Sequence, residues 1–401
     1  MDWQDSEDSV AARPVTDAEA RALVGKPPAS GAWRDGDPAG ARRFTGIGTV
    51  TTEAGARIPG VRIAWESWGA LSPRRDNAVL VLHALTGDAH LTGPAGPGQP
   101  TAGWWEGVVG PGLALDTDRF HVVAPNVLGG CSGTTGPASL GPDHQEWGGR
   151  FPYLTIRDQV AAQVAFADAL GIDRWAAVVG GSMGGMHALE WAVTAPDRVA
   201  RLAVLAAPAR STADSIALNS VQTEAVRADQ RFRGGDYYGA ADGDGPQRGL
   251  ALARRMALLN YRSPSELNDR FGRSWQSGVS PLGHHGRFAV ESYLDFHGNR
   301  FTRRFDANSY IRLVDAMSSH DVGRDRGGVP AALARFTGPA LVLGVDSDRL
   351  YPVADQRVVA AGLPGALDGD EPAVLSSDFG HDAFLIEREA VGRRLERLLQ
   401  D

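Results

Sequence analysis

The sequence predicts an α/β fold in which a mostly parallel central sheet is flanked by helices. Short apolar runs, such as residues 78–83 and 339–345, are typical of strands that are buried on both faces of a sheet. Segments with apolar residues at helical spacing lie between such runs, and strands that alternate with helices favour a parallel sheet. The run at 175–191 passes from an apolar strand through glycines around Ser182 into a helix, so we expect a sharp strand-to-helix turn there.

The first predicted strands lie at one edge of this sheet. Residues 47–52 and 61–68 are strand-like, with apolar and polar residues in alternation. This pattern indicates two antiparallel edge strands that lead to the buried strand at 78–83. The elements expected next are a strand at 120–128, a helix at 155–170, the strand and helix around Ser182, and a strand at 201–208.

The strand pattern stops between residues 209 and 335, where helical patterns dominate. We expect this stretch to be a helical lid inserted into a catalytic domain made of residues 44–208 and 336–401. Residues 1–43 mix Pro, Gly and charge, which predicts a loosely ordered N-terminal arm. The remaining expected elements are helices at 17–24, 215–227, 249–259, 263–273, 309–319, 352–361 and 382–400, and a strand at 373–376.

Composition argues against several classes of partner and cofactor. The 40 basic and 48 acidic residues give a net charge of −8 without blocks of either sign, so we expect neither a nucleic-acid partner nor a membrane partner. Cys131 is the single cysteine, which excludes an intramolecular disulfide and a cysteine-based zinc site. The acidic N-terminus does not resemble a signal peptide, and no stretch reaches a membrane-spanning length. We therefore expect a cytoplasmic protein without a bound metal.

Residues 180–184, Gly-Gly-Ser-Met-Gly, fit the pattern G-x-S-x-G around Ser182. Small residues on both sides let a strand and a helix approach closely and present a nucleophilic hydroxyl at the helix N-terminus. The competing interpretation is a Gly-rich turn with an N-cap serine. The apolar strand before it and the helix after it favour the nucleophile, and with it the α/β-hydrolase fold.

A nucleophilic serine needs a histidine base and an acid that orients it. His381 follows the last predicted strand and Asp348 follows the strand before it, which is the order along the chain that this fold uses. Asp346 is a rival for the acid that spacing alone does not exclude. We expect an oxyanion hole from the backbone N–H of Met183 and that of Leu85 or Thr86.

Several longer motifs carry a more specific resemblance. They are residues 83–87 (His-Ala-Leu-Thr-Gly), 126–137 (Asn-Val-Leu-Gly-Gly-Cys-Ser-Gly-Thr-Thr-Gly-Pro), 180–191, 304–310 (Arg-Phe-Asp-Ala-Asn-Ser-Tyr) and 347–352 (Ser-Asp-Arg-Leu-Tyr-Pro). From about residue 44 to the C-terminus the chain resembles the homoserine O-acetyltransferases. One departure from the family is His187, where a glutamine is expected.

The resemblance implies roles for individual residues. Ser182 is the nucleophile, Asp348 rather than Asp346 is the triad acid, and His381 is the base. Arg254 falls at the position that binds the substrate carboxylate, and Asp382 falls at the position that binds its amino group. Tyr261 and Thr86 are further candidates for substrate contact.

The resemblance also implies a reaction: acetyl transfer from acetyl-CoA to the hydroxyl of L-homoserine through an acetyl-serine, in methionine biosynthesis. No cofactor is bound, acetyl-CoA is a co-substrate, and a homodimer forms through the helical insertion. Four alternatives stay open: homoserine O-succinyltransferase, serine O-acetyltransferase or an acetyltransferase for a secondary metabolite's hydroxyl, all of the same fold, and a plain serine esterase. A non-catalytic binding protein is disfavoured because all three triad residues are present.

Overall fold

The computed structural model describes residues 23–283 and 285–400. Within them, eight strands form one sheet in the order β1-β2-β6-β3-β7-β8-β9-β10. β1 pairs antiparallel with β2, β2 pairs antiparallel with β6, and the other pairs are parallel, which confirms the predicted mostly parallel sheet. The strands are β1 Arg43–Thr51, β2 Arg57–Trp68, β3 Ala78–Leu82, β6 His121–Pro125, β7 Ala177–Gly181, β8 Leu202–Leu205, β9 Ala340–Val345 and β10 Ala373–Leu375, with β4 Val109–Gly110 and β5 Leu115–Asp116 forming a small separate pair.

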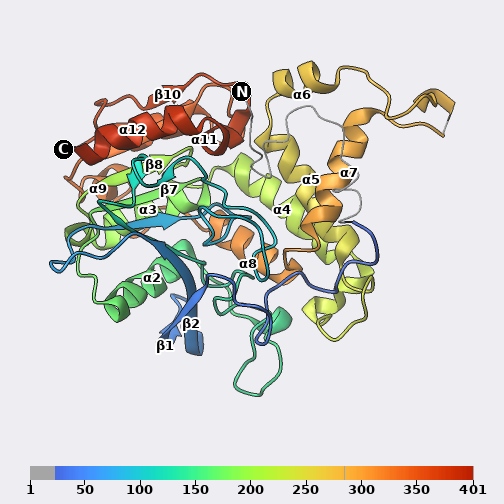
Figure 1. Ribbon diagram of the computed structural model, residues 1–401, viewed down its shortest axis with the longest axis horizontal. Coiled ribbons are helices and arrows are strands. Elements are labelled where there is room, and N and C mark those ends of the chain that lie inside the picture. Colours follow the sequence, from blue (N-terminus) through green and yellow to red (C-terminus); the bar gives the residue numbers. More distant parts are fainter. Residues whose placement is uncertain (1–22, 284, 401) are drawn as a thin grey trace.

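The central strands are buried on both faces, so alternate residues of one strand belong to two different cores. Leu80 and Leu82 of β3 pack into one core, and Val79 and Val81 pack into the other. Helices α2 (Ile156–Leu170), α3 (Met183–Thr194) and α10 (Val353–Gly362) contribute to the first core, and α12 (Arg388–Gln400) contributes to the second. In Figure 1, α12 lies above the sheet and α2 lies below it. This layering holds the carboxyl ends of the parallel strands at one edge.

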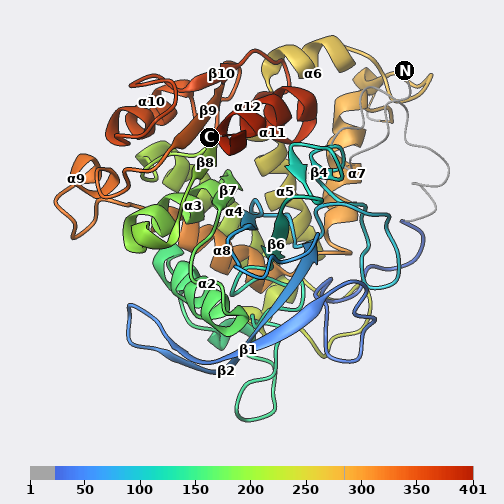
Figure 2. The same cartoon turned by 60° about the vertical axis from the view of Figure 1, so that its left-hand side comes forward.

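Local sequence signals set the ends of α2. The Thr155 hydroxyl accepts from the Asp158 backbone N–H, and the Asp158 carboxylate accepts from the backbone N–H of Thr155, which makes a capping box. Gly171 ends the helix at φ 66°, a conformation that glycine adopts without strain. Figure 2 shows that β1 and β2 form a long pair across the lower edge of the molecule, beneath this helix.

A helical region occupies the chain between β8 and β9. It contains α4 Ala213–Arg227, α5 Gln247–Tyr261, α6 Pro264–Phe271, α7 Ala289–Phe301, α8 Ala307–Ser318 and α9 Val329–Leu333. Figure 1 shows α4 to α7 gathered to the right of the sheet. Short 3-10 helices lie at Gly148–Arg150, Pro196–Arg198, Gln230–Gly235, Pro281–Gly283 and Gly380–Asp382.

The sequence predictions missed the short helix α9 and differ from the structure at two longer helices. Helix α7 was not predicted, and its Gly298 lies so close to α5 that a Cβ there would be 2.9 Å from the Ala251 carbonyl oxygen. Tight helix packing therefore explains a residue that lowers helix propensity. The terminal helix expected over 382–400 is divided into α11 (Ala383–Ile386) and α12, because Glu387 leaves the helical conformation (φ −80°, ψ 52°) and its carboxylate accepts from the Ser377 hydroxyl.

The described part of the N-terminal arm is attached to the rest of the protein, in contrast to the loose arm expected over residues 1–43. The backbone N–H of Gly31 donates to the Phe305 carbonyl (3.1 Å), and that of Trp33 donates to the Cys131 carbonyl (2.9 Å). Ala32 between them is buried. The helix expected near 17–24 lies almost entirely outside the described residues. Across the described chain, every helix is too short or too polar to cross a bilayer.

Candidate active site

Ser182 lies on a strained turn between β7 and α3, with φ 56° and ψ −124°. The flanking glycines are required by close packing. A Cβ on Gly180 would lie 2.0 Å from the Gly184 carbonyl oxygen, and a Cβ on Gly184 would lie 2.0 Å from that of Leu82. A non-glycine residue held in this backbone region is typical of a functional site, because the surrounding structure must impose the strain.

The structure brings together the serine, histidine and aspartate selected from the sequence. The Ser182 hydroxyl donates to Nε2 of His381 (2.8 Å), and Nδ1 of His381 donates to Oδ2 of Asp348 (2.7 Å). The other Asp348 oxygen accepts from the backbone N–H groups of Leu350 (2.8 Å) and Tyr351 (3.0 Å), which fixes the carboxylate. All three catalytic candidates are buried.

Asp346, the rival acid, takes no part in this array. It is exposed, and its Oδ1 accepts from the backbone N–H of Ser377 (3.1 Å). The electrostatics also favour the Asp348–His381 pair. Burial opposes the charged imidazolium, but the negative charge of Asp348 and its hydrogen bond outweigh burial and raise the pKa of His381 above its ordinary value. Asp348 can therefore stabilise the imidazolium that forms when His381 accepts a proton.

The triad opens into a small cavity that also contains the predicted substrate contacts. Its lining residues are Ala84, Leu85, Thr86, Ser182, Arg254, Tyr261, His381, Asp382, Phe384 and Leu385. The sheet supplies the triad, the turn after β3 supplies residues 84–86, and α5 supplies Arg254 and Tyr261. Seven residues that were selected for the nucleophile, the base, the oxyanion hole and substrate binding come from separate parts of the chain and line one cavity. They are Leu85, Thr86, Ser182, Arg254, Tyr261, His381 and Asp382.

Arg254 is buried in this cavity and is not on a solvated helix face. Its Nη1 donates to the Thr86 hydroxyl (3.2 Å), and its guanidinium lies 5.6 Å from the centre of the Tyr261 ring. The neighbouring Arg255 lies partly exposed and pairs with Asp295 at 2.9 Å. Of the two adjacent arginines, Arg254 alone lines the cavity.

Sequence reasoning missed a residue next to Asp382. Arg262, directly after α5, lies with its Nε 3.2 Å from Oδ2 of Asp382, and both side chains are buried. The planar guanidinium of Arg262 can therefore fix the orientation of the Asp382 carboxylate. Nothing in the local sequence distinguishes Arg262 from other arginines at helix ends, because its partner is far away in the chain.

Comparison with known proteins agrees with this geometry. The family model for the alpha/beta hydrolase fold matches residues 77–387. A homoserine O-acetyltransferase of Clavibacter michiganensis subsp. michiganensis is 72% identical over 385 residues, which cover 96% of this chain and 99% of the relative. The chain belongs to the homoserine O-acetyltransferase family.

Solved structures show that this family fold is shared with esterases. The homoserine O-acetyltransferase from Bacillus anthracis has a TM-score of 0.80 at 26% identity and covers 90% of this chain and 97% of its own. Esterase E22 has a TM-score of 0.79 at 27% identity, with coverages of 89% and 99%. The overall fold therefore does not by itself distinguish transfer from hydrolysis.

His187, the departure from the homoserine O-acetyltransferase motif, is a buried neighbour of the site. Its Nε2 lies 2.8 Å from the side-chain oxygen of Gln159 on α2. Burial lowers the pKa of His187 to about 3, so the imidazole is neutral. The side chain packs between α3 and α2 and does not line the catalytic cavity.

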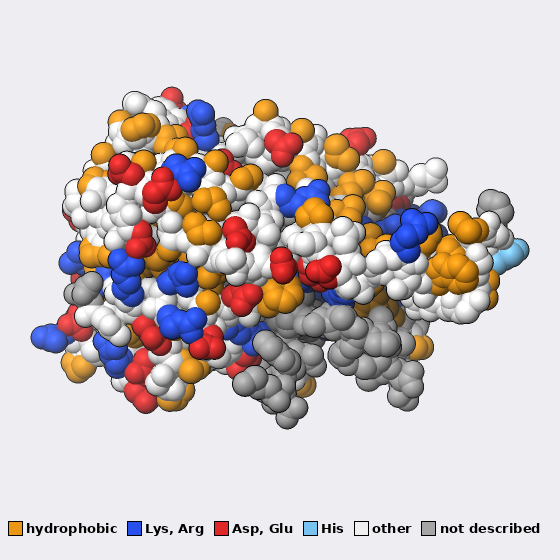
Figure 3. All heavy atoms as spheres, turned by 90° about the horizontal axis from the view of Figure 1, so that it is seen from above, with side chains coloured by type: hydrophobic (Ala, Val, Ile, Leu, Met, Phe, Trp, Pro, Cys, Tyr) orange, Lys and Arg blue, Asp and Glu red, His pale blue; other side chains and the backbone are white. Residues whose placement is uncertain are grey.

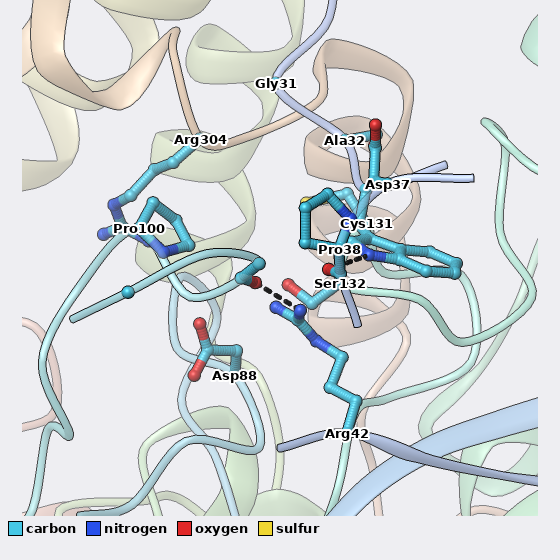
Figure 4. A pocket seen from close by; sticks show the side chains of 13 residues that line it. Gly31, Ala32, Asp37, Pro38, Arg42, Asp88, Pro100, Cys131, Ser132 and Arg304 are labelled. Carbon is cyan, nitrogen blue, oxygen red and sulfur yellow. Dashed lines mark hydrogen bonds between the residues drawn. The ribbon is translucent and has the colours of Figure 1, made fainter. Parts of the chain in front are cut away.

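A second hollow lies beside the turn that follows β3, and Figure 4 shows its charged residues Asp37, Arg42, Asp88 and Arg304. It does not contain Ser182. Arg304 Nη1 donates to the Thr86 carbonyl (2.9 Å), and Asp88 Oδ1 accepts from the backbone N–H of His90 (2.9 Å). These charged groups brace the loops around them, including the turn that carries Leu85 and Thr86. Among the described residues, no group of three or more His, Cys, Asp or Glu side chains is arranged to hold a metal ion.

Proposed function

We propose that the protein transfers an acetyl group from acetyl-CoA to the hydroxyl of L-homoserine and so supplies O-acetyl-L-homoserine for methionine biosynthesis. The observation that carries this proposal is the buried Ser182–His381–Asp348 array in one cavity with Arg254 and Asp382. Relatives named homoserine O-acetyltransferase support it at high identity over nearly the whole chain.

The first half-reaction acetylates Ser182. His381 accepts the hydroxyl proton through Nε2 as the Ser182 oxygen attacks the thioester carbonyl. The tetrahedral oxyanion is stabilised by the backbone N–H groups of Met183 and Leu85. The carbon–sulfur bond then breaks, the sulfur takes the proton from His381, and CoA leaves with the acetyl group on Ser182.

The second half-reaction reverses these roles with a different nucleophile. His381 accepts the proton of the homoserine hydroxyl as its oxygen attacks the acetyl carbon. The second oxyanion uses the same N–H groups, and its collapse returns the proton to Ser182. Because CoA leaves before the acceptor reacts, the kinetics are expected to be ping-pong.

The acceptor is held by charges of opposite sign. The Arg254 guanidinium binds the homoserine carboxylate, and Asp382, oriented by Arg262, binds the ammonium group. Thr86 and Tyr261 contact the bound acceptor from two sides of the cavity. Homoserine held by both charged groups on its α-carbon directs its side-chain hydroxyl, at the other end of the molecule, toward the acetyl carbon.

The deciding experiment measures thiol release from acetyl-CoA by the purified protein, with and without L-homoserine. Parallel assays use succinyl-CoA as donor and L-serine as acceptor. We expect release that depends on homoserine and prefers the acetyl donor. Release with succinyl-CoA or L-serine instead would move the function to one of the related acyltransferases.

Hydrolysis is the second candidate, and the structural likeness to esterase E22 favours it specifically. Water would then replace homoserine as the nucleophile on the acetyl-serine. The two readings differ in the acceptor dependence of turnover: thiol release that is fast without any acceptor would identify an esterase or thioesterase. Buried, oppositely charged Arg254 and Asp382 favour transfer, since water needs neither.

Replacement of Arg254 by alanine is expected to raise the KM for L-homoserine about 100-fold or more, with a much smaller change in the KM for acetyl-CoA, because a charge-assisted contact to the acceptor is lost. Steady-state kinetics with each substrate varied separately measure this. Arg255→Ala, next to it but paired with Asp295, is the matched control and should leave both constants near wild type. Equal changes in both KM values for Arg254→Ala would make Arg254 a structural residue.

We also propose a cytoplasmic homodimer formed through the helical region. Cys131 is buried and is the sequence's single cysteine, which fits a reducing compartment. Large apolar side chains are exposed on this region, and Figure 3 shows such side chains at the projecting end of the molecule, between α6 and α7. The exposed residues are Ile216, Val221, Leu252, Leu259, Trp275, Val279 and Leu282.

Light scattering after size-exclusion chromatography tests the dimer. Leu252 and Leu259 are seven residues apart on α5 and each is 41% exposed, so a Leu252→Asp/Leu259→Asp variant should elute as a monomer. Val358→Asp on α10 alters an apolar residue outside this region that is 52% exposed, and this variant should remain dimeric. A monomeric wild-type protein would contradict the proposal.

A further inference from the structure

In the turn after β3, two hydrogen-bond donors converge on the carbonyl oxygen of Ala84. The backbone N–H of Gly87 donates to the Ala84 carbonyl (3.0 Å), which closes a tight turn over residues 84–87. Nδ1 of His83 lies 2.8 Å from the same carbonyl oxygen. The Ala84 carbonyl and the Leu85 N–H belong to one peptide unit. A hydrogen-bond donor that fixes the Ala84 carbonyl therefore also fixes the direction of the Leu85 N–H.

The proton on His83 is located by its second contact. The backbone N–H of Val127 donates to Nε2 of His83 (3.1 Å), so Nε2 carries a lone pair and the proton is on Nδ1. Nδ1 must then donate to the Ala84 carbonyl. The ring is buried, and burial lowers the pKa of His83 although the hydrogen bond to Ala84 and the charge of Asp88 oppose this. The neutral form that both hydrogen bonds require is therefore the form present.

A donor on a peptide carbonyl strengthens the N–H of the same peptide, because hydrogen bonds in series polarise one another. Two donors, from His83 and Gly87, act on the Ala84 carbonyl. We propose that His83 is a positioning residue for the oxyanion hole: its Nδ1–H orients and polarises the peptide that carries the Leu85 N–H. This inference rests on the proposed function, in which Leu85 stabilises the oxyanion. His83 itself does not touch the reacting atoms.

Two substitutions separate the two hydrogen bonds of His83. The amide nitrogen of asparagine lies as many bonds from Cβ as Nδ1 does, so His83→Asn retains a donor for the Ala84 carbonyl. The amide oxygen of glutamine corresponds in the same way to Nε2, so His83→Gln retains only the acceptor for Val127. His187→Gln is the matched control, because His187 is a buried neutral histidine nearby that hydrogen-bonds to Gln159 and not to this turn.

The test measures the rate at which Ser182 is acetylated in a single turnover with acetyl-CoA, by rapid quenching and mass spectrometry of the intact protein. We expect His83→Gln to slow acetylation about tenfold or more. This loss is smaller than the loss caused by removal of an entire oxyanion-hole donor. His83→Asn should recover most of the wild-type rate. The KM for L-homoserine should be the same in all variants, and His187→Gln should acetylate at the wild-type rate.

Melting temperatures are measured for the same set. Wild-type acetylation in His83→Gln would overturn the inference and leave the proposed function intact. Rates that fall in all three variants in proportion to melting temperature would also overturn it, since His83 would then only pack the turn. A wild-type protein that is not acetylated on Ser182 would instead overturn the proposed function, and this inference with it.

Discussion

Ser182→Ala is expected to lower kcat for acetyl transfer by about 10⁴-fold or more, because it removes the hydroxyl that donates to the His381 base and would carry the acetyl group. The loss should appear already in the first turnover, as an absence of acetylated protein. Stability should change little. The substitution removes one hydroxyl, whose hydrogen bond is to His381, and leaves the strained backbone at φ 56° unchanged.

The comparison for this variant is Ser132→Ala, which removes a hydroxyl from the neighbouring hollow and leaves the triad intact. It should turn over like wild type. Thermal melting and intact-protein mass are measured on both. A folded Ser182→Ala protein with near wild-type turnover would refute the covalent mechanism.

Asp348→Asn should cost about 10⁴-fold in kcat, since an amide in place of the carboxylate no longer stabilises the imidazolium or fixes the tautomer of His381. Asp346→Asn is the matched control. It is the same substitution two residues away on an exposed side chain, and it should retain activity. Similar losses in both variants would mean that the acid had been assigned wrongly.

The residual activity of Asp348→Asn should also show a shifted pH profile. Transfer needs neutral His381, whose pKa the Asp348 charge raises, so the wild-type rate should fall as pH drops through this raised value. In Asp348→Asn the effect of burial remains and the charge and hydrogen bond of Asp348 are gone, so that only the smaller contribution of the Asp382 charge still raises the pKa of His381. The pKa of His381 should fall, and the acidic limb of the profile of kcat/KM against pH should move to lower pH. If the acidic limb does not move, the titration of a group other than His381 causes it.

The sequence was informative where local patterns determine structure. The apolar runs predicted the buried strands, and Thr155 and Asp158 placed the start of α2 within one residue. Close packing of backbone explains why the glycines around Ser182 were so clear a signal. The order along the chain, after successive strands, pointed to His381 as the base and to Asp348 or Asp346 as the acid, the family resemblance favoured Asp348, and the structure brings Asp348 and His381 together.

Features that depend on distant parts of the chain could not be predicted in this way. Helix α7 packs closely against α5 at Gly298, a residue that lowers helix propensity and gave no local helix signal. Arg262 was missed because its partner, Asp382, comes after β10, far along the chain. The attachment of residues 30–33 depends on backbone partners more than 90 residues away. No window of sequence contains both members of these pairs.

The position of the helical region has a consequence for how this family can diversify. The triad comes from loops and turns at the ends of sheet strands. Arg254 and Tyr261 come from the helical region, which is one continuous segment between the adjacent strands β8 and β9. Mutations in the helical region can therefore change which acceptor binds while the triad residues keep their alignment. A transferase and an esterase do share this architecture. New substrate ranges are thus reached without rebuilding the chemistry.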